Sequence, residues 1–215
     1  TSLFGTQVPP VDDTQKPMNI GDGLSNAGVS WSWYSGGWDN AAGNVGGRGW
    51  TNGSGPSCSD PNSAAAATVG NATGGFPFCP DKSFQTHHQP FNYFARYAPG
   101  QPGRTHLQDE QDFLAAVSAG ELPAVSFVKP LGLDNEHPGY TGEPRGSDHL
   151  VDLIQAIETG PQAGNTLIVV TYDEFGGQWD HASPPGMGTP AASGPADLFG
   201  PGTRVPTLLV ARSLT

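Results

Sequence analysis

Short apolar or alternating runs predict four β-strands along the chain. Residues 29–34, VSWSWY, alternate between two sets of side chains, which is the period of a strand with two different faces. Residues 124–128 (AVSFV) and 206–211 (PTLLVA) are short apolar runs that also predict strands. Residues 166–172, TLIVVTY, form a continuous apolar run, which is typical of a strand buried on both faces of a parallel sheet.

Three other segments predict α-helices. Residues 147–159, SDHLVDLIQAIET, place apolar side chains at helical spacing on one face. Residues 109–119, DEQDFLAAVSA, begin with acidic residues, which suit a helix N-terminus, and end at Gly120. Residues 19–27, NIGDGLSNA, predict a shorter helix.

The order of these elements indicates the fold class. Helices and strands alternate in the second half, which predicts an α/β fold with a mostly parallel sheet flanked by helices. A length of 215 residues fits a single domain over residues 1–215. Residues 39–82 are rich in Gly, Asn, Ser, Pro and Ala, and they predict a long loop without regular elements. Residues 91–97, FNYFARY, predict one aromatic helical turn.

Charge and composition narrow the range of partners. Lys and Arg number 9 and Asp and Glu number 20, so the net charge is −11. The lack of a basic patch argues against nucleic acid or an anionic membrane as a main partner. No run of 18 apolar residues occurs, so we expect no transmembrane segment.

The two cysteines leave two alternatives open. Cys58 and Cys79 lie 21 positions apart in a stretch poor in large apolar residues, without the spacing of a zinc site. They are either a disulfide that clips this loop or two free thiols. We favour the disulfide, because a loop with so little apolar surface needs a covalent clip. A disulfide would place the protein outside the reducing cytosol, so we expect a secreted or periplasmic protein.

Acidic residues follow the longest apolar run directly. Asp173 and Glu174 come directly after residues 166–172. A Gly-Gly turn follows them, and Asp180 and His181 add two more polar side chains after that turn. Open α/β sheets bind ligands at the carboxyl ends of their strands. Adjacent carboxylates at such a place favour a cation, since like charges repel without one. The alternative is a helix cap or a solvated turn, and the pattern favours a metal or catalytic site.

Histidines occur in two polar segments. His87 and His88 are neighbours in THHQPFNY, and in an extended chain their side chains would point apart. They either share one ligand after a turn, or one of them is buried and structural while the other is exposed. His137 lies in LDNEHPG, beyond the strand predicted at 124–128, where the alternative is an ordinary turn. We expect His149 on the surface of its helix.

Taken together, these segments resemble one known family. The matching blocks are WSWYSGGW (31–38), HHQPFNYFARY (87–97), NEHPG (135–139), TLIVVTYDEFGGQWDHASPP (166–185) and GPGTRVPTLLV (200–210). In this order they are similar to the phosphoesterase family of acid phosphatases and phospholipases C, which belongs to the alkaline-phosphatase-like superfamily. The YDEFGG and WDH block is specific, and HHQPFNYF with WYSGGW points to the acid-phosphatase branch.

The resemblance implies roles for individual residues. Asp173 and Glu174 match the acidic pair that helps to hold a divalent metal ion, whose identity carboxylate and histidine ligands do not specify. His181 matches a position close to that metal. The resemblance implies hydrolysis of a phosphate ester, stabilised electrostatically by metal and histidines.

The remaining histidines match positions near the phosphate. His87 and His88 match the paired histidines of the family, and His137 matches its single histidine. The resemblance implies that these three bind phosphoryl oxygens or donate a proton to the leaving group.

The resemblance covers only the carboxyl-terminal part of the family's sequence. An upstream block of the family supplies a Glu-Asn pair to the metal and a Ser or Thr thought to be the nucleophile, and no such block occurs in these 215 residues. We therefore expect an incomplete alkaline-phosphatase-like sheet and a requirement for an upstream portion. The alternatives are a phospholipase C that acts on lipid headgroups, and a non-catalytic fragment that binds a partner or self-associates through unpaired strand edges.

Overall fold

The computed structural model describes residues 18–52, 77–184 and 202–212. The chain divides into two compact units, Thr1–Gln162 and Ala163–Thr215, and the assignment of one domain to the whole chain stays a prediction. Cys58, the predicted partner of Cys79, lies outside the described residues.

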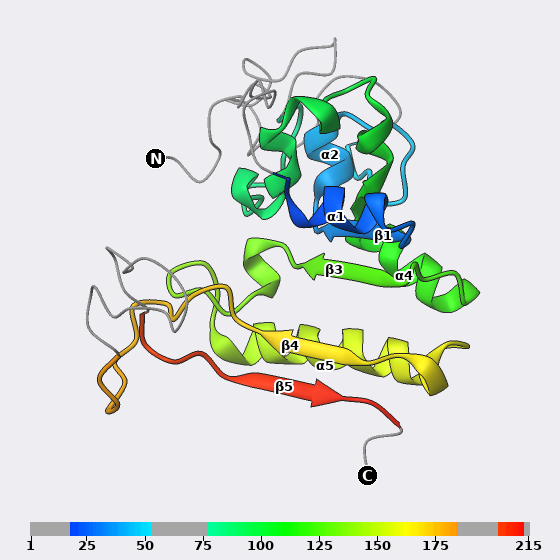
Figure 1. Ribbon diagram of the computed structural model, residues 1–215. Helices are drawn as coiled ribbons and strands as arrows, with labels where there is room; N and C mark the ends of the chain where they lie inside the picture. Colours follow the sequence, from blue (N-terminus) through cyan, green and yellow to red (C-terminus); the bar gives the residue numbers. More distant parts are fainter. Residues whose placement is uncertain (1–17, 53–76, 185–201, 213–215) are drawn as a thin grey trace. The chain divides into compact units, whose positions relative to one another are not determined.

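A parallel three-stranded sheet forms the centre of the first unit (Figure 1). Its order is β2 (Leu107–Asp109), β1 (Trp31–Ser35), β3 (Val125–Lys129). Trp33 is in register with Leu107 on one side and with Phe127 on the other. The predicted α/β class with a parallel sheet is confirmed. The three-residue strand β2 was not predicted, because so short a segment carries no alternation.

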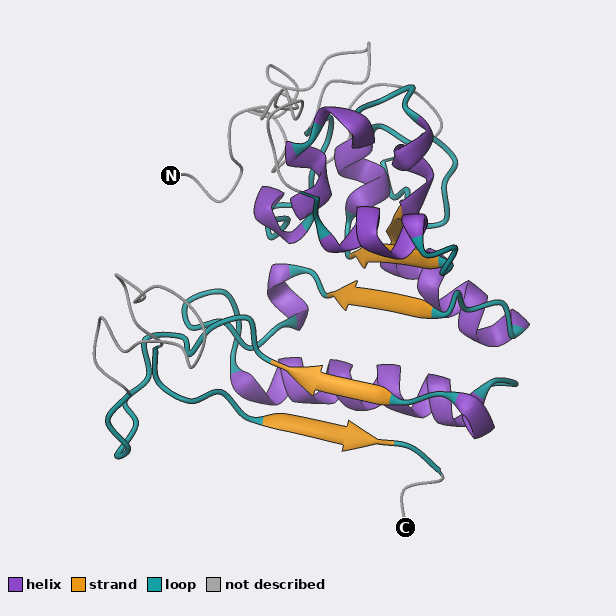
Figure 2. Cartoon of the chain, viewed as in Figure 1, coloured by secondary structure: helices purple, strands orange, loops and turns teal. Residues whose placement is uncertain are grey.

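In the part of the chain that the structure describes, four α-helices accompany this sheet (Figure 2). They are α1 (Ile20–Asn26), α2 (Trp38–Ala42), α4 (Glu110–Ala119) and α5 (Glu143–Thr159). Asp109 caps α4 by accepting the Gln111 N–H at 3.0 Å, and Gly120 ends α4 in the left-handed conformation at φ 72°. The predicted helix is therefore confirmed, with its first residue one position later, at Glu110.

Two predictions differ from the structure by more than one or two residues. Helix α5 begins four residues before the predicted start at 147, because Pro144 suits a first helical turn. Residues 39–82 were predicted to lack regular elements, but α2 occupies their beginning. The short sequence WDNAA lies between two left-handed glycines, Gly37 and Gly43, and has too few residues to show a helical period.

Short 3₁₀ turns link the main elements. Residues 91–97 form two such turns and not the single turn that was predicted. The turns are η2 (Thr86–His88), η3 (Pro90–Tyr93), η4 (Ala95–Tyr97), η5 (Pro102–His106), η6 (Gly132–Asp134) and, in the second unit, η7 (Ala163–Asn165).

Alternate residues of β1 face two apolar clusters. Trp31 packs in an aromatic cluster with Phe91 and Tyr97. Tyr34 packs on the other side with Phe113 of α4 and Leu153 of α5. The two alternating sets of side chains therefore lie on two buried faces. β1 is the middle strand of the described sheet because it pairs with β2 along one edge and with β3 along the other.

The second unit contains an antiparallel strand pair. β4 (Ile168–Thr171) pairs with β5 (Thr207–Val210), and Ile168 is in register with Val210. The prediction of a strand in residues 166–172 is confirmed for Ile168–Thr171. Its predicted parallel pairing and its burial on both faces are wrong within the described residues, where Val169 is 55% exposed. An apolar run reports the tendency to be buried and carries no information on the direction of the partner strand.

Candidate active site

The carboxyl ends of β1 and β3 lie close together. The Gly36 N–H donates to the Lys129 carbonyl at 3.0 Å. A Cβ at position 36 would stand 2.6 Å from the backbone nitrogen of Leu131, so the close approach of the segments after β1 and β3 requires glycine at position 36. The loops that follow the strands therefore start at one edge of the sheet, where α/β proteins bind ligands.

The histidine pair lies beside this edge. His88 is 5% exposed, and its Nδ1 lies 3.3 Å from the Pro130 carbonyl oxygen. Trp33 Nε1 donates to the His88 carbonyl at 2.7 Å. His87 is exposed, and the two rings stand edge to face with centroids 4.7 Å apart. Turn η2 therefore brings the two rings into contact, with one of them fixed and the other accessible.

Two glutamines that the sequence pattern did not single out flank this pair. Gln85 is 2% exposed and Gln89 is 0% exposed, and among the described residues none of their amide atoms has a hydrogen-bond partner. A Cβ at Gly132 would stand 2.6 Å from Gln85 Nε2, so Gln85 packs directly on the loop after β3. The signal for this burial is the position of the polar run QTHHQ between the aromatic residues Phe84 and Phe91.

His137 lies on the loop that follows β3 and η6. Its N–H donates to Asn135 Oδ1 at 2.9 Å, and its ring stacks on Tyr140 with centroids 4.2 Å apart. His137 is exposed. The first unit thus brings the histidine pair and the start of the His137 loop to the same strand ends, and His137 contacts Asn135 and Tyr140 of its own loop.

The acidic pair lies in the second unit. Asp173 and Glu174 follow β4 as predicted and are exposed, and Glu174 Oε2 accepts the Gly176 N–H at 2.6 Å. The Asp180 carboxylate accepts hydrogen bonds from Arg204 Nε at 2.8 Å and from a terminal guanidinium nitrogen of Arg204 at 2.9 Å. The guanidinium holds the pKa of Asp180 well below its usual range, so this carboxylate stays ionised and engaged with Arg204.

The six predicted site residues are divided between the two units. His181 Nδ1 lies 3.6 Å from Asp180 Oδ1. The first unit holds His87, His88 and His137, and the second holds Asp173, Glu174 and His181. Their convergence on one centre stays a prediction.

The acidic pair fits a metal ion in ligand type. Carboxylate oxygens are the ligands that hard divalent cations take. Across residues 18–52, 77–184 and 202–212, no three side chains of His, Cys, Asp or Glu gather into a group that could hold a metal ion. A complete metal site therefore needs ligands in addition to Asp173 and Glu174.

A second pair of carboxylates is buried and accepts hydrogen bonds from backbone N–H groups. Asp109 Oδ2 accepts the Asp39 N–H at 3.0 Å, and Asp39 Oδ2 accepts the Gly49 N–H at 2.8 Å. Burial raises the pKa of Asp109 to about 6, although two backbone N–H groups act in the opposite direction. Since backbone donors occupy these oxygens, the pair fixes the starts of α2 and α4.

Two other histidines are engaged in structural contacts. The His106 ring stacks on Trp31 at 4.1 Å between centroids. His149 Nε2 lies 2.9 Å from Glu110 Oε1, and the His149 side chain is 22% exposed. The prediction of a surface position for His149 is wrong, because α5 turns this face toward the start of α4.

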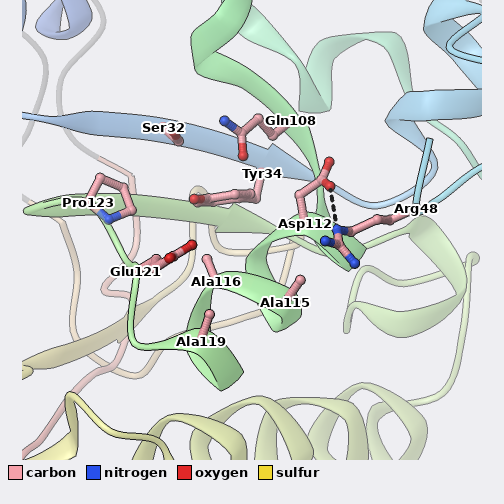
Figure 3. A pocket seen from close by; sticks show the side chains of 10 residues that line it. All are labelled: Ser32, Tyr34, Arg48, Gln108, Asp112, Ala115, Ala116, Ala119, Glu121 and Pro123. Carbon is pink, nitrogen blue, oxygen red and sulfur yellow. Dashed lines mark ion pairs between the residues drawn. The ribbon is translucent and has the colours of Figure 1, made fainter.

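A hollow of about 370 Å³ opens between β1 and α4 (Figure 3). Arg48 Nε pairs with Asp112 Oδ1 at 3.6 Å beside it. The small side chains of α4 leave the space that Tyr34 and Ser32 border from the strand. None of the six predicted site residues lines this hollow.

Comparisons with known proteins identify the family of this chain. The model of the phosphoesterase family matches residues 5–212, and the chain belongs to this family. It is 32% identical over 117 residues to non-specific phospholipase C6 of Arabidopsis thaliana, covering 48% of this chain and 22% of that protein. It is 33% identical over 147 residues to phospholipase C A of Mycobacterium tuberculosis, covering 60% and 26%. Non-hemolytic phospholipase C of Burkholderia pseudomallei is 29% identical over 150 residues, covering 55% and 21%.

The matches span between a fifth and about a quarter of these relatives, which are therefore much longer than the aligned part. Among the described residues, no helix has the length and apolar character needed to cross a membrane.

Proposed function

We propose that this chain is the carboxyl-terminal part of a metal-dependent phosphoric ester hydrolase of the acid-phosphatase type, and that turnover requires an upstream portion of the polypeptide. The observation that carries the proposal is the family match over residues 5–212. The histidine pair at the strand ends supports it, because imidazoles at this edge of an α/β sheet can meet a bound phosphate.

The surroundings of the three histidines support a different role for each of them. A proton on His88 Nδ1, directed to the Pro130 carbonyl, leaves Nε2 of that ring as an acceptor. His87 is exposed beside it and would bind phosphoryl oxygens. His137, on the neighbouring loop, would donate a proton to the leaving group or bind the same oxygens.

The second unit would contribute the metal ligands. Asp173 and Glu174 would hold a divalent cation through their carboxylate oxygens, with His181 nearby. When bound, the cation would supply positive charge to the phosphoryl group. Arg204 supports this role indirectly, because it neutralises Asp180 and fixes the end of the loop that carries the pair.

A second candidate function is that of a phospholipase C. It is favoured by the names of the relatives, which are phospholipases C from a plant and from bacteria. Acid phosphatases and phospholipases C cleave different bonds, so their products distinguish them. The phosphatase releases inorganic phosphate from a monoester, and the phospholipase releases a phosphorylated headgroup from a lipid.

The test compares the 215-residue chain with the longer polypeptide isolated from its natural source and characterised by intact mass and N-terminal sequencing. Both are assayed with p-nitrophenyl phosphate and with phosphatidylcholine vesicles, before and after EDTA and after return of divalent ions. We expect hydrolysis of the aryl phosphate by the longer polypeptide, its loss with EDTA, and no turnover by the chain alone. Turnover of vesicles only would favour the phospholipase, and no turnover of either substrate would favour the non-catalytic alternative.

A further inference from the structure

The loop before His137 is attached to the start of α5. Three successive residues of the helix each contact one residue of the loop, so the two segments are joined along their length. Arg145 Nε donates to Asp134 Oδ1 at 2.9 Å, a Cβ at Gly146 would stand 2.6 Å from the Asn135 carbonyl oxygen, and Ser147 Oγ donates to Glu136 Oε1 at 2.7 Å.

The start of α5 is in turn attached to α4 through one charged pair. His149 Nε2 lies 2.9 Å from Glu110 Oε1, and the Glu110 side chain is 7% exposed. The other oxygen, Glu110 Oε2, is buried and has no hydrogen-bond partner among the described residues. A buried carboxylate with a single cationic partner depends strongly on that partner, because loss of the cation leaves an uncompensated charge.

The charge of His149 controls this pair. The pKa of His149 is raised above its ordinary value of 6.5, mainly by Glu110 from α4, and further by Asp134 from η6 and Asp152 from α5, while burial acts in the opposite direction. Asp134 also pairs with Arg145. The stabilisation that comes from the protonation of His149 is lost as pH rises through its raised pKa, which lies above 6.5.

We propose that Glu110 and His149 are positioning residues that act through α5 on the loop at 134–137, and so set the place of the His137 ring. The role of His137 itself rests on the proposed function. The pair joins α4 to α5, so its influence on the loop passes through the helix. Attachment at Asp134, Asn135 and Glu136 gives that path a physical basis.

The first test needs no change in the pair. In a His137→Gln background, which removes the titration of His137, the amide NMR signals of Asn135 and Glu136 are followed against pH together with the His149 ring. We expect the loop signals to change with the same midpoint as the His149 ring, above pH 6.5. Loop signals that do not change while His149 titrates would overturn the proposal.

The second test uses Glu110→Gln in the otherwise unchanged chain, with Glu121→Gln as the control. Glu121 is exposed just beyond the end of α4, so its substitution removes one charge without touching the pair. At pH 6 we expect amide-exchange protection of residues 134–137 to fall about tenfold in Glu110→Gln, because the ion pair with His149 is lost, and to stay unchanged in the control.

A third variant, His149→Lys, keeps a positive charge at higher pH and is expected to retain loop protection there. Unchanged protection in Glu110→Gln would overturn the proposal, as would a pH response in His149→Lys with the wild-type midpoint. These measurements use no turnover. If the longer polypeptide lacks phosphoesterase activity while the loop follows His149, the proposed function fails and the coupling stands.

Discussion

Gly49 lies directly against the carboxylate of Asp109, so closely that a Cβ at position 49 would overlap the carboxyl group. The Gly49 N–H donates to the neighbouring carboxylate of Asp39 at 2.8 Å. This contact joins the segment after α2 to the start of α4 across 60 positions of the chain. The two buried carboxylates, Asp39 and Asp109, therefore hold these two segments of the first unit together.

Substitution of Gly49 by alanine is expected to destabilise the protein. The added methyl group must displace the Asp109 carboxylate, and overpacking of this kind costs about 1–3 kcal/mol. The matched control is Gly23→Ala in α1, where a Cβ would meet nothing within 4 Å, and where alanine should stabilise by about 0.5–1 kcal/mol. Urea unfolding of both variants measures the difference, and equal midpoints would contradict the crowding at Gly49.

Asp109 is expected to make stability depend on pH. Its pKa in the folded protein is about 6, above the ordinary value of 3.8, so the folded state binds more protons between these values. The free energy of unfolding therefore falls as pH rises from about 4 to 6, with a contribution of about 2–3 kcal/mol. Asp109→Asn removes this pH dependence. The Asn amide nitrogen cannot accept a hydrogen bond, so one of the two backbone N–H donors loses its acceptor and the variant is less stable than the wild type at pH 4. The stability gap to the wild type should narrow by pH 7, and a constant gap would refute the assignment.

Cys58 and Cys79 are expected to form a disulfide. Cys79 is 0% exposed, and its carbonyl accepts Asn52 Nδ2 at 3.1 Å, so one end of the predicted bridge is firmly held. A loop of this length gains roughly 3 kcal/mol of stability from a bridge in the chain-entropy model. Thiol counting in denaturant without reductant should find no free thiol. Two free thiols would remove the bridge and, with it, the main reason to expect export.

Asp173→Asn in the longer polypeptide is expected to abolish metal-dependent hydrolysis of an aryl phosphate. Asparagine keeps the size of the side chain and removes the negative charge that a divalent cation requires. Metal affinity, measured by calorimetry, should fall together with turnover, while circular dichroism stays unchanged because Asp173 is exposed. Asp81→Asn, which lies outside the predicted site, is the charge-matched control. Full metal affinity in Asp173→Asn would exclude this carboxylate as a ligand.

His137→Ala is expected to separate turnover from metal binding. The imidazole is proposed to meet the phosphoryl or leaving group, so its loss should lower kcat by about 100-fold or more while metal affinity persists. Tyr140→Phe is a useful companion, since it retains the ring on which His137 stacks. A parallel loss of metal affinity in His137→Ala would instead make His137 a metal ligand.

The sequence by itself determined the local elements and the family. The alternation at 29–34, the cap at Asp109, the left-handed Gly120 and the apolar run at 166–172 each act within a few neighbouring residues, so the printed order of residues contains their whole signal. The blocks around His87, Asp173 and His181 also indicated the phosphoesterase family, which the match over residues 5–212 confirms.

Only the tertiary structure decided which distant residues meet. It gave β4 an antiparallel partner, buried Gln85 and Gln89 beside the histidine pair, and turned His149 from the surface toward Glu110. These outcomes depend on how helices and strands that are tens of residues apart in the sequence pack together. The spacing of apolar residues along the chain carries no information on such contacts. A buried charge, for example, becomes stable only when packing brings it a partner, so Glu110 resembles any acidic residue of a first helical turn until α5 is in place.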